Sequence, residues 1–487
     1  MSIKEELKYS LIENGSRSCV VIGDSDYSYT DVAQIINSLN QSLKDYTVIA
    51  FESTKDIYSY ACILYCILND KVFVPVSSDQ PVERVCYILN GSRAEIFFTD
   101  TTPEGYQGNV ISKSSVHTHL DDATESDVIT SSNGHNDLSY ILYTSGSTGH
   151  PKGVKIGRQS LSTFINNIQK DIDIKPDDRI SQFYELIFDV SIQDIMLSVL
   201  SGATLVVCTD SDKLFPHRFI ADKRITVWSS VPSALTALID RLYRSSVSLP
   251  ELRISIFAGE ALSPEFVRKW AKICTSSQIF NLYGPTETTI GICWTELTEE
   301  NIKNGDVSIG VPPQDHKYHL EDDSGNPSQS KGELIIEGSQ VAIGYTSGDM
   351  KGFHSGGSAR SYRTGDIVEF RNNKLYYLGR KDSQLKVRGY RIDLRDVEEN
   401  LRKLCNFSDI HVVSPELRRV RILVAVSESQ SVIDTLRATD SPLPGYMKPD
   451  KYIAIDNIPK TLSGKTDKKK LTRLIEKKIN GESNERY

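Results

Sequence analysis

Short apolar runs alternate with helix-length segments through the N-terminal half of the chain, and this alternation restricts the fold more than any other feature. Residues 48–51 and 72–76 are apolar on both faces, as buried strands are, and residues 57–68 between them are long enough for a helix. Parallel strands need helices to cover both faces of their sheet. The order of these segments therefore predicts parallel β-sheets covered by α-helices.

The same alternation continues further along the chain. Further strands are predicted at residues 96–99, 138–142, 204–208, 226–229 and 254–258, and further helices at residues 82–89, 233–244 and 264–274. Residues 310–368 break into short strands separated by Gly, Asn and Asp, which indicates a small β-barrel-like subdomain.

A second domain is predicted to begin after residue 381. Its predicted elements are a strand at residues 384–387, a helix at 394–404, strands at 410–413 and 421–426, and a helix at 431–438. Roughly a hundred residues of mixed α and β structure make a domain of ordinary size. The predicted fold is therefore α/β, with an N-terminal core at residues 1–381 and a small α+β lid domain at residues 382–487.

Composition and charge exclude several classes of protein. A chain of 487 residues, 39% of them hydrophobic, is too long for a single hydrophobic core. The formal charge of −8 argues against nucleic acid as a partner, and the basic residues between 465 and 478 are interpreted as a solvated helix face. No run of about 18 apolar residues is present, so no membrane span is expected.

The cysteines and the N-terminus favour a cytoplasmic protein. The eight cysteines are scattered without a CxxC pair, and Cys62 and Cys66 are interpreted as small core residues on one helix face. The first 14 residues are polar and lack the apolar region of a signal peptide. Both features fit a reducing cytoplasm.

Residues 143–153, with the sequence YTSGSTGHPKG, follow the predicted strand at residues 138–142. Three glycines and four Ser/Thr residues supply backbone N–H and hydroxyl donors, and a lysine adds positive charge, so this loop is suited to a polyphosphate. A Walker A loop is excluded, because Pro459 stands where the first glycine before Gly464 would be needed. The candidate phosphate-binding residues are Thr144, Ser145, Gly146, Ser147, Thr148, Gly149 and Lys152.

This loop resembles the phosphate loop of the adenylate-forming superfamily, which includes the amino-acid adenylation domains of nonribosomal peptide synthetases, acyl-CoA ligases and luciferases. Further motifs similar to those of the superfamily follow in the same order, so the resemblance extends over residues 20–470. It implies a mobile lid domain, ATP as a co-substrate and Mg²⁺ as a cofactor.

Two further segments resemble the nucleotide-binding motifs of the superfamily. In residues 281–287, NLYGPTE, the resemblance implies that Tyr283 stacks on adenine, Thr286 contacts the α-phosphate and Glu287 binds Mg²⁺ through its carboxylate. In residues 362–366, YRTGD, Asp366 would accept hydrogen bonds from both ribose hydroxyls. The remaining residues implied to bind ATP are Gly259, Glu260, Ala261, Asn281, Leu282, Gly284, Tyr377 and Arg380.

The lid carries the segments that resemble the catalytic and hinge motifs. Residues 462–465, LSGK, resemble the catalytic-lysine motif, in which Lys465 would neutralise the attacking carboxylate and the α-phosphate. Asp382 matches the hinge position, and residues 386–391 resemble the segment that enters the site for a thiol-transfer step. The resemblance therefore implies that lid rotation exchanges Lys465 for this segment between two half-reactions.

Residues 188–194, FDVSIQD, resemble the substrate-pocket segment of amino-acid adenylation domains, in which Asp189 would pair with an α-ammonium group. An acid without this cation would leave a lone buried carboxylate, at a cost of roughly several kcal/mol. The implied pocket lining is Asp189, Val190, Gln193, Ser229, Ile256, Ala258, Leu282, Ile290, Gly291 and Lys465. This short, mostly apolar pocket is similar to that of proline-activating domains. L-proline is therefore the predicted substrate, with other small amino acids, including D-alanine, as alternatives.

The acceptor is expected to be the phosphopantetheine thiol of a separate carrier protein, because too few residues follow Lys465 for a carrier domain. Residues 356–358, GGS, lie within the series of motifs and are interpreted as a loop rather than a phosphopantetheine site. Two alternatives remain open. An acyl-CoA ligase is disfavoured by Asp189, and a catalytically silent relative is disfavoured by the presence of Lys465, Asp366 and Glu287.

Overall fold

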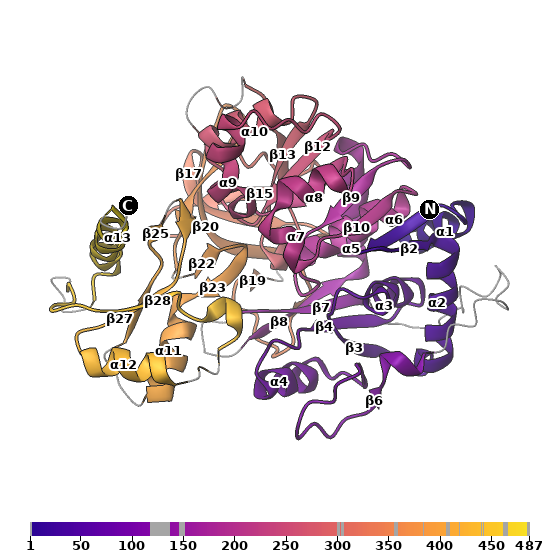
Figure 1. Cartoon of the computed structure of the whole chain (residues 1–487), viewed down its shortest axis with the longest axis horizontal. Coiled ribbons are helices and arrows are strands. Elements are labelled where there is room, and N and C mark those ends of the chain that lie inside the picture. Colours follow the sequence, from indigo (N-terminus) through magenta and orange to yellow (C-terminus); the bar gives the residue numbers. More distant parts are fainter. Residues whose placement is uncertain are drawn as a thin grey trace.

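The computed structural model describes residues 2–116, 137–145, 151–299, 302, 306–354, 359–382, 384–405, 410–417, 419–439, 441, 443–460 and 466–484. Two large sheets with helices around them form the N-terminal core, and the lid lies beside this core (Figure 1). The α/β architecture predicted from the alternation of segments is confirmed.

The first large sheet has seven strands in the order β18–β8–β7–β4–β3–β5–β6. Strands β3 to β7 pair in parallel, whereas β8 and β18 add to the edge in antiparallel orientation. Its strands are β3 (Val48–Glu52), β4 (Val72–Val76), β5 (Ile96–Phe98), β6 (Val110–Ile111), β7 (Leu138–Thr144), β8 (Lys152–Gly157) and β18 (Gly344–Tyr345). The neighbouring helices are α2 (Tyr29–Leu43), α3 (Ile57–Leu68), α4 (Val82–Ser92) and α5 (Arg158–Asp171).

The second large sheet has eight strands in the order β14–β13–β12–β11–β9–β10–β1–β2, parallel except at its two edges. Its strands are β1 (Ser18–Ile22), β2 (Ser25–Ser28), β9 (Arg179–Gln182), β10 (Thr204–Val207), β11 (Val227–Ser230), β12 (Ile254–Ala258), β13 (Gln278–Tyr283) and β14 (Cys293–Glu296). The accompanying helices are α1 (Ile3–Glu13), α6 (Asp189–Leu200), α7 (Asp210–Leu214), α8 (Pro216–Asp222), α9 (Ser233–Arg244) and α10 (Pro264–Ile273).

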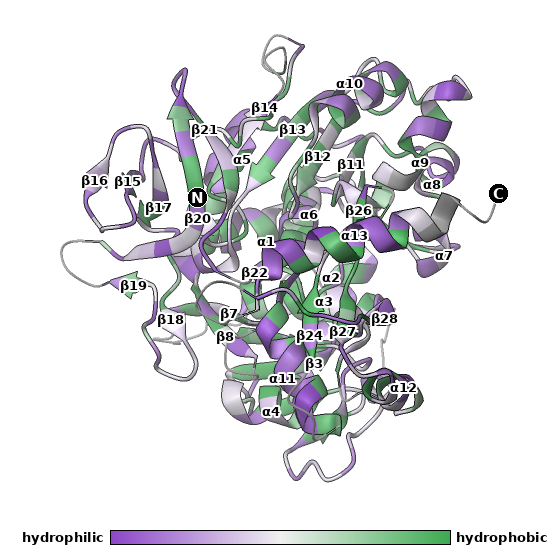
Figure 2. Ribbon diagram, turned by 90° about the vertical axis from the view of Figure 1, so that its left-hand side faces the viewer, coloured by the Kyte–Doolittle hydropathy of each residue, from purple (hydrophilic) through white to green (hydrophobic). Residues whose placement is uncertain are grey.

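Helix α3 lies within the core that the two sheets share. All its residues except Tyr58 are buried, and one hydrophobic cluster joins them to Phe51 and Phe73 of the first sheet and to Leu205 of the second. A helix that is apolar on every side must be buried on every side, and the ribbon around α3 is correspondingly green in Figure 2. Cys62 and Cys66 are fully buried here, as predicted.

A third sheet is entirely antiparallel and has six strands. They are β15 (Lys317–Glu321), β16 (Pro327–Ser328), β17 (Lys331–Glu337), β19 (Phe353–His354), β20 (Ser361–Arg371) and β21 (Lys374–Arg380). The prediction of short strands after residue 310 is confirmed. The sheet continues beyond residue 368, because β20 turns directly into β21.

The lid begins with the hairpin of β22 (Gln384–Val387) and β23 (Tyr390–Asp393). Its other elements are α11 (Leu394–Cys405), β24 (His411–Val413), β25 (Glu416–Leu417), β26 (Val420–Arg421), β27 (Val424–Ser427), α12 (Gln430–Ala438), β28 (Lys451–Ala454) and α13 (Lys468–Asn484). Buried apolar residues between 387 and 479 form two clusters of their own. This supports the boundary expected after residue 381, which stays a prediction.

Helix α13 lies at the outer side of the lid (Figure 1). Leu471, Ile475 and Ile479 are buried at four-residue spacing, whereas Lys469 and Lys470 are exposed, as a solvated basic face requires. Lys468 departs from this interpretation, because it is half-buried and pairs with Glu398. Lys465 lies outside the described residues. Among the helices in the described ranges, we find none with the length and apolar character needed to span a bilayer.

Candidate active site

Two adjoining cavities lie at the carboxyl ends of β12 and β13, beneath the lid hairpin of β22 and β23. The larger cavity has a volume of about 610 Å³ and the smaller one about 80 Å³. Gly259 and Leu282 of the core line both cavities, as do Lys386 and Arg391 of the hairpin. The carboxyl ends of parallel strands are a common place for ligand sites in α/β proteins.

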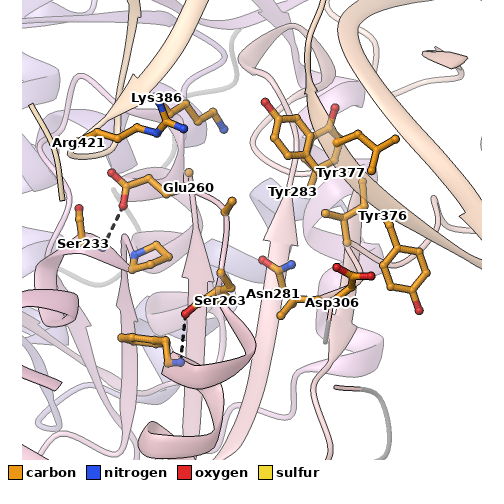
Figure 3. Close-up of a pocket in the computed structure, with 18 of the residues that line it drawn as sticks. Ser233, Glu260, Ser263, Asn281, Tyr283, Asp306, Tyr376, Tyr377, Lys386 and Arg421 are labelled. Carbon is orange, nitrogen blue, oxygen red and sulfur yellow. Dashed lines mark hydrogen bonds between the residues drawn. The ribbon is translucent and has the colours of Figure 1, made fainter. Parts of the chain in front are cut away.

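The residues predicted to contact adenosine line the larger cavity. Tyr283 at the end of β13 and Tyr377 on β21 have ring centroids 6.3 Å apart and planes inclined by 42°. Figure 3 shows these two rings on one side of the cavity and Glu260, Lys386 and Arg421 on the other. The predicted residues in this lining are Gly259, Glu260, Ala261, Asn281, Leu282, Tyr283, Asp366, Tyr377 and Arg380.

Asp366, the predicted ribose ligand, is buried and held by two donors. The Tyr283 hydroxyl donates to Oδ2, and Arg380 Nη1 donates to Oδ1 over 2.7 Å. A carboxylate offers about four acceptor positions, so roughly two remain for the hydroxyls of a ligand. The structure therefore fixes the orientation of Asp366 and still allows it to bind a diol.

Glu260 connects the core to the lid hairpin. Its Oε2 accepts a hydrogen bond from the backbone N–H of Ser233 (2.9 Å), and its Oε1 accepts one from the backbone N–H of Gly389 (2.7 Å). Gly389 has a φ of +83°, and a Cβ atom at this position would lie 2.5 Å from Val231 Cγ1. Only glycine allows this close approach of the hairpin. The resemblance implied that Glu260 binds ATP, and the structure shows that it also holds the lid hairpin through Gly389.

The smaller cavity contains Asp189, the first residue of α6. This side chain is buried, and its Oδ2 accepts a hydrogen bond from the backbone N–H of Ile290 over 3.2 Å. Burial raises the pKa of Asp189 to about 6, although the Thr286 hydroxyl and the Lys386 charge act to lower it. The predicted residues in this lining are Thr144, Ser145, Asp189, Val190, Ala258, Gly259, Leu282, Gly284, Thr286 and Ile290.

The backbone before Gly291 is strained where it meets Asp189. Thr289 and Ile290 have φ values of +57° and +64°, a region that β-branched residues rarely adopt. This conformation presents the Ile290 N–H to the Asp189 carboxylate. Strain of this kind is frequent at functional sites, which supports a role for Asp189 beyond that of a helix N-terminus.

Four residues of the predicted substrate pocket, Gln193, Ser229, Ile256 and Gly291, lie outside both cavity linings. Gln193 and Ser229 are buried, and Gln193 Oε1 and Ser229 Oγ have no hydrogen-bond partner among the described residues. The neighbouring Asp194 was not predicted. Its Oδ2 also has no partner in the described part of the chain, and burial raises its pKa to about 8.

Glu287, the predicted metal contact, is engaged in this lid arrangement. Its Oε1 accepts a hydrogen bond from the Tyr345 hydroxyl (2.8 Å), and its Oε2 accepts one from Arg391 Nη1 (2.6 Å). A guanidinium at this distance repels a cation, and no group of three or more potential metal ligands occurs among the described residues. The residues around Glu287 therefore do not fit a magnesium ion here, and its metal contact stays a prediction.

Only part of the predicted phosphate loop belongs to the described residues. Ser145 Oγ donates a hydrogen bond to the backbone oxygen of Arg391 over 2.5 Å, so the start of the loop contacts the lid hairpin. Lys152 lies outside both cavity linings, with its Nζ 3.1 Å from Asp349 Oδ2. Gly146, Ser147, Thr148, Gly149 and Lys465 lie outside the described residues.

The predicted hinge residue, Asp382, is paired with Arg380. Nε and Nη2 of Arg380 donate to the two carboxylate oxygens of Asp382 over 2.8 and 2.9 Å. Since Arg380 also donates to Asp366, one guanidinium links the predicted ribose ligand to the predicted hinge.

Several residues at these cavities were not predicted from the sequence, among them Arg421 in the larger cavity and Tyr446 in the smaller one. Tyr345, which donates to Glu287, lines neither cavity and was not predicted either. Tyr446 follows Pro444 and Gly445, which mark a turn, but a turn signal does not show that the turn lies at the site.

Comparison with known proteins identifies a family model and several similar proteins. The family model described as AMP-binding enzyme matches residues 12–346. The D-alanine–D-alanyl carrier protein ligase of Bacillus licheniformis is 31% identical over 432 residues, which cover 84% of the chain and 85% of the relative. A linear gramicidin synthase polypeptide of Brevibacillus parabrevis is 34% identical over 424 residues, which cover 82% of the chain but only 5% of that relative.

Solved structures share the fold over almost the whole chain. The Vibrio cholerae adenylation domain AlmE, in complex with glycyl-adenosine-5'-phosphate, has a TM-score of 0.85 at 24% identity, with 97% of each chain covered. IdnL7 has a TM-score of 0.69 at 27% identity, with 98% of this chain and 99% of the other covered.

Proposed function

The chain belongs to the family of AMP-binding enzymes, and we propose that it uses ATP to convert an amino acid to its aminoacyl-adenylate and then transfers the aminoacyl group to a carrier-protein thiol. In the first step a carboxylate oxygen attacks the α-phosphorus and pyrophosphate leaves. In the second step a thiolate attacks the acyl carbon and AMP leaves.

The observation that carries this proposal is the position of Asp189. Its buried carboxylate lines a small cavity that adjoins the larger one, and the surrounding walls include Val190, Ala258 and Ile290. A buried carboxylate without an ion-pair partner is costly even when it accepts hydrogen bonds, and an α-ammonium group provides the matching charge. A substrate with an ammonium group next to its carboxylate would place that carboxylate towards the nucleotide.

The proposed substrate is a small amino acid, and L-proline is our first candidate. A compact, mostly apolar body fits a cavity of about 80 Å³. A second candidate is D-alanine, because a D-alanine–D-alanyl carrier protein ligase is 31% identical over most of its own length. The pocket residue Gln193, on which the proline prediction partly depends, does not line this cavity, so the two substrates have to be separated by experiment.

The proposed reaction requires two lid arrangements. The structure has the hairpin of β22 and β23 above the cavities, with Lys386 in the lining of both. We assign this arrangement to the thiol-transfer step, in which residues 386–391 were expected at the site. For adenylation, Lys465 would have to approach the α-phosphate, where a positive charge stabilises the transition state.

The proposed function is tested by ATP–pyrophosphate exchange with a panel of the common L-amino acids and D-alanine. We expect exchange with one or a few small amino acids and with L-proline most strongly. The activated amino acid is then offered to a phosphopantetheinylated carrier protein and to coenzyme A in parallel. No exchange with any amino acid would contradict the proposal, and transfer only to coenzyme A would replace the carrier protein as acceptor.

A further inference from the structure

An aromatic contact connects the lid to the residue that precedes Asp189. The ring of Tyr446 stacks on that of Tyr390, with centroids 4.3 Å apart and planes inclined by 11°. The Tyr390 ring meets Phe188 in an edge contact, with centroids 4.8 Å apart and planes at 75°. Phe188 precedes α6 and is therefore adjacent to Asp189 in the chain. A row of three rings thus extends from the lid to the amino-acid end of the site.

The hydroxyl end of Tyr446 contacts the core separately. Arg84 of α4 donates a hydrogen bond from Nη2 to the Tyr446 hydroxyl over 3.4 Å. Burial raises the pKa of Tyr446, with the Arg84 charge opposing this effect, so the phenol is neutral at physiological pH. Tyr446 therefore contacts its own domain through the ring and the core through the hydroxyl.

Tyr390 is also the middle residue of the hairpin segment that contacts the core. On one side the Gly389 N–H donates to Glu260 over 2.7 Å, and on the other side Arg391 pairs with Glu287 over 2.6 Å. These two contacts require a defined position of the Tyr390 backbone. The stacked Tyr446 ring fixes the position of Tyr390 from within the lid. This position allows the residues on either side of Tyr390 to contact Glu260 and Glu287 at the same time.

We infer that Tyr446 is a positioning residue for the thiol-transfer step: it holds Tyr390 against Phe188 and so stabilises the lid arrangement in which the hairpin closes the site. The inference rests on the proposed function. The Tyr390–Tyr446 stack lies within the lid, whereas the Phe188–Tyr390 and Arg84–Tyr446 contacts cross to the core. Loss of Tyr446 should therefore disfavour this arrangement while Asp189, Asp366 and the other charged groups of the two cavities stay in place.

The inference is tested by comparing the two half-reactions in the full chain. Tyr446→Ala is expected to slow transfer of the aminoacyl group from preformed adenylate to a phosphopantetheinylated carrier protein by about two- to tenfold, the range expected for an aromatic pair. The rate of ATP–pyrophosphate exchange should fall by clearly less. Tyr446→Phe keeps the stack and should retain most of the transfer rate. Tyr9→Ala, an exposed tyrosine on α1, is the matched control and should change neither rate.

A second measurement does not depend on activity. Hydrogen–deuterium exchange of peptides covering residues 384–393 should speed up in Tyr446→Ala, because the Gly389 N–H loses its protection. Peptides covering α12 should not change, which distinguishes repositioning of the hairpin from unfolding of the lid. If Tyr446→Ala does not fold, Tyr446→Leu replaces it.

Equal losses in both half-reactions, or unchanged transfer with unchanged hairpin exchange, would overturn the inference. If the proposed function itself is wrong, the experiments give a different result. In that case the wild-type chain would show no pyrophosphate exchange with any amino acid, while the deuterium measurement would still report on Tyr446.

Discussion

Arg391 of the lid, which lines both cavities, forms an ion pair with the buried Glu287 of the core, with Nη1 2.6 Å from Oε2. Burial acts to raise the pKa of Glu287, but the Arg391 charge and the hydrogen bonds outweigh it and lower the pKa below 4.5. Because the folded pKa is lowered, the stabilisation by this pair is fully present above pH 4.5 and is lost only as the pH falls through the lowered pKa. The pair therefore persists at neutral pH.

Replacing Arg391 should destabilise this lid arrangement. Removal of one partner from a buried ion pair costs about 3–5 kcal/mol, because it leaves the other charge unpaired. Arg391→Ala is therefore expected to slow thiol transfer strongly while pyrophosphate exchange continues, measured as separate half-reactions. Arg388→Ala is the matched control, since this exposed arginine of the same hairpin pairs with Asp450 inside the lid. Similar losses in the two variants would mean that the Arg391–Glu287 pair is not specific for this arrangement.

The pKa of Asp189 predicts how amino-acid use depends on pH. Burial raises this pKa to about 6, and only the ionised carboxylate can pair with an ammonium group. The value of kcat/KM for the amino acid should therefore fall below about pH 6, by up to about tenfold per pH unit, because this ratio reports ionisations of the free enzyme. Asp189→Asn should show a much lower kcat/KM without this step. A wild-type profile that stays flat down to pH 5 would contradict the ammonium pairing.

The sequence predicted the elements of the core closely, because each of them carries its own pattern. Residues 57–68, 72–76 and 254–258 have the bounds observed for α3, β4 and β12. The residues expected to contact adenosine could be identified from the sequence as well, because Tyr283, Asp366 and Arg380 each lie in a local motif. All three line the larger cavity.

The lid contacts could not be predicted in the same way. Glu287 with Arg391, and Phe188 with Tyr390 and Tyr446, are pairs far apart in the chain, and their contact depends on the rotation of one domain against the other. The substrate pocket was predicted with more residues than line the smaller cavity. Gln193 and Ser229 are buried but line neither cavity in this arrangement, because side-chain packing as well as sequence position decides which residues reach an open space, and their role stays a prediction.

Asp366 should determine the affinity for ATP. Its carboxylate is oriented by Tyr283 and Arg380 and has acceptor positions left for ribose hydroxyls. Hydrogen bonds to a charged group contribute about 1.5–3 kcal/mol, so Asp366→Asn is expected to raise the KM for ATP by roughly 10- to 150-fold. The KM for the amino acid should change much less. Asp323→Asn, in an exposed turn of the third sheet, provides the control. An unchanged KM for ATP would remove Asp366 from the nucleotide site.

Lys465 should be needed for adenylation but not for nucleotide binding. Loss of a charge that stabilises a transition state typically slows the reaction by about 10²–10³-fold. Lys465→Ala should therefore abolish most pyrophosphate exchange while the Kd for ATP, measured by calorimetry, stays within about threefold. Lys469→Ala, an exposed lysine of α13, should leave exchange unchanged. Near-normal exchange in Lys465→Ala would show that another cation serves the first step.

Asp194 should make the stability of the fold depend on pH in the opposite sense to Glu287. Burial raises its pKa from 3.8 to about 8, and its Oδ2 has no hydrogen-bond partner among the described residues. Between these two pH values the folded state binds the proton more tightly than the unfolded chain, so the free energy of unfolding should decrease as the pH rises, by up to about 1.4 kcal/mol per pH unit.

Asp194→Asn removes this ionisation and should be the more stable protein at pH 8, measured by urea unfolding from pH 5 to pH 8. Asp434→Asn, an exposed residue of α12, should follow the wild type. If the wild type and Asp194→Asn lose stability in parallel, Asp194 is already ionised over this pH range, and the groups that oppose the effect of burial, Gln193, Ser229 and Lys55, outweigh it.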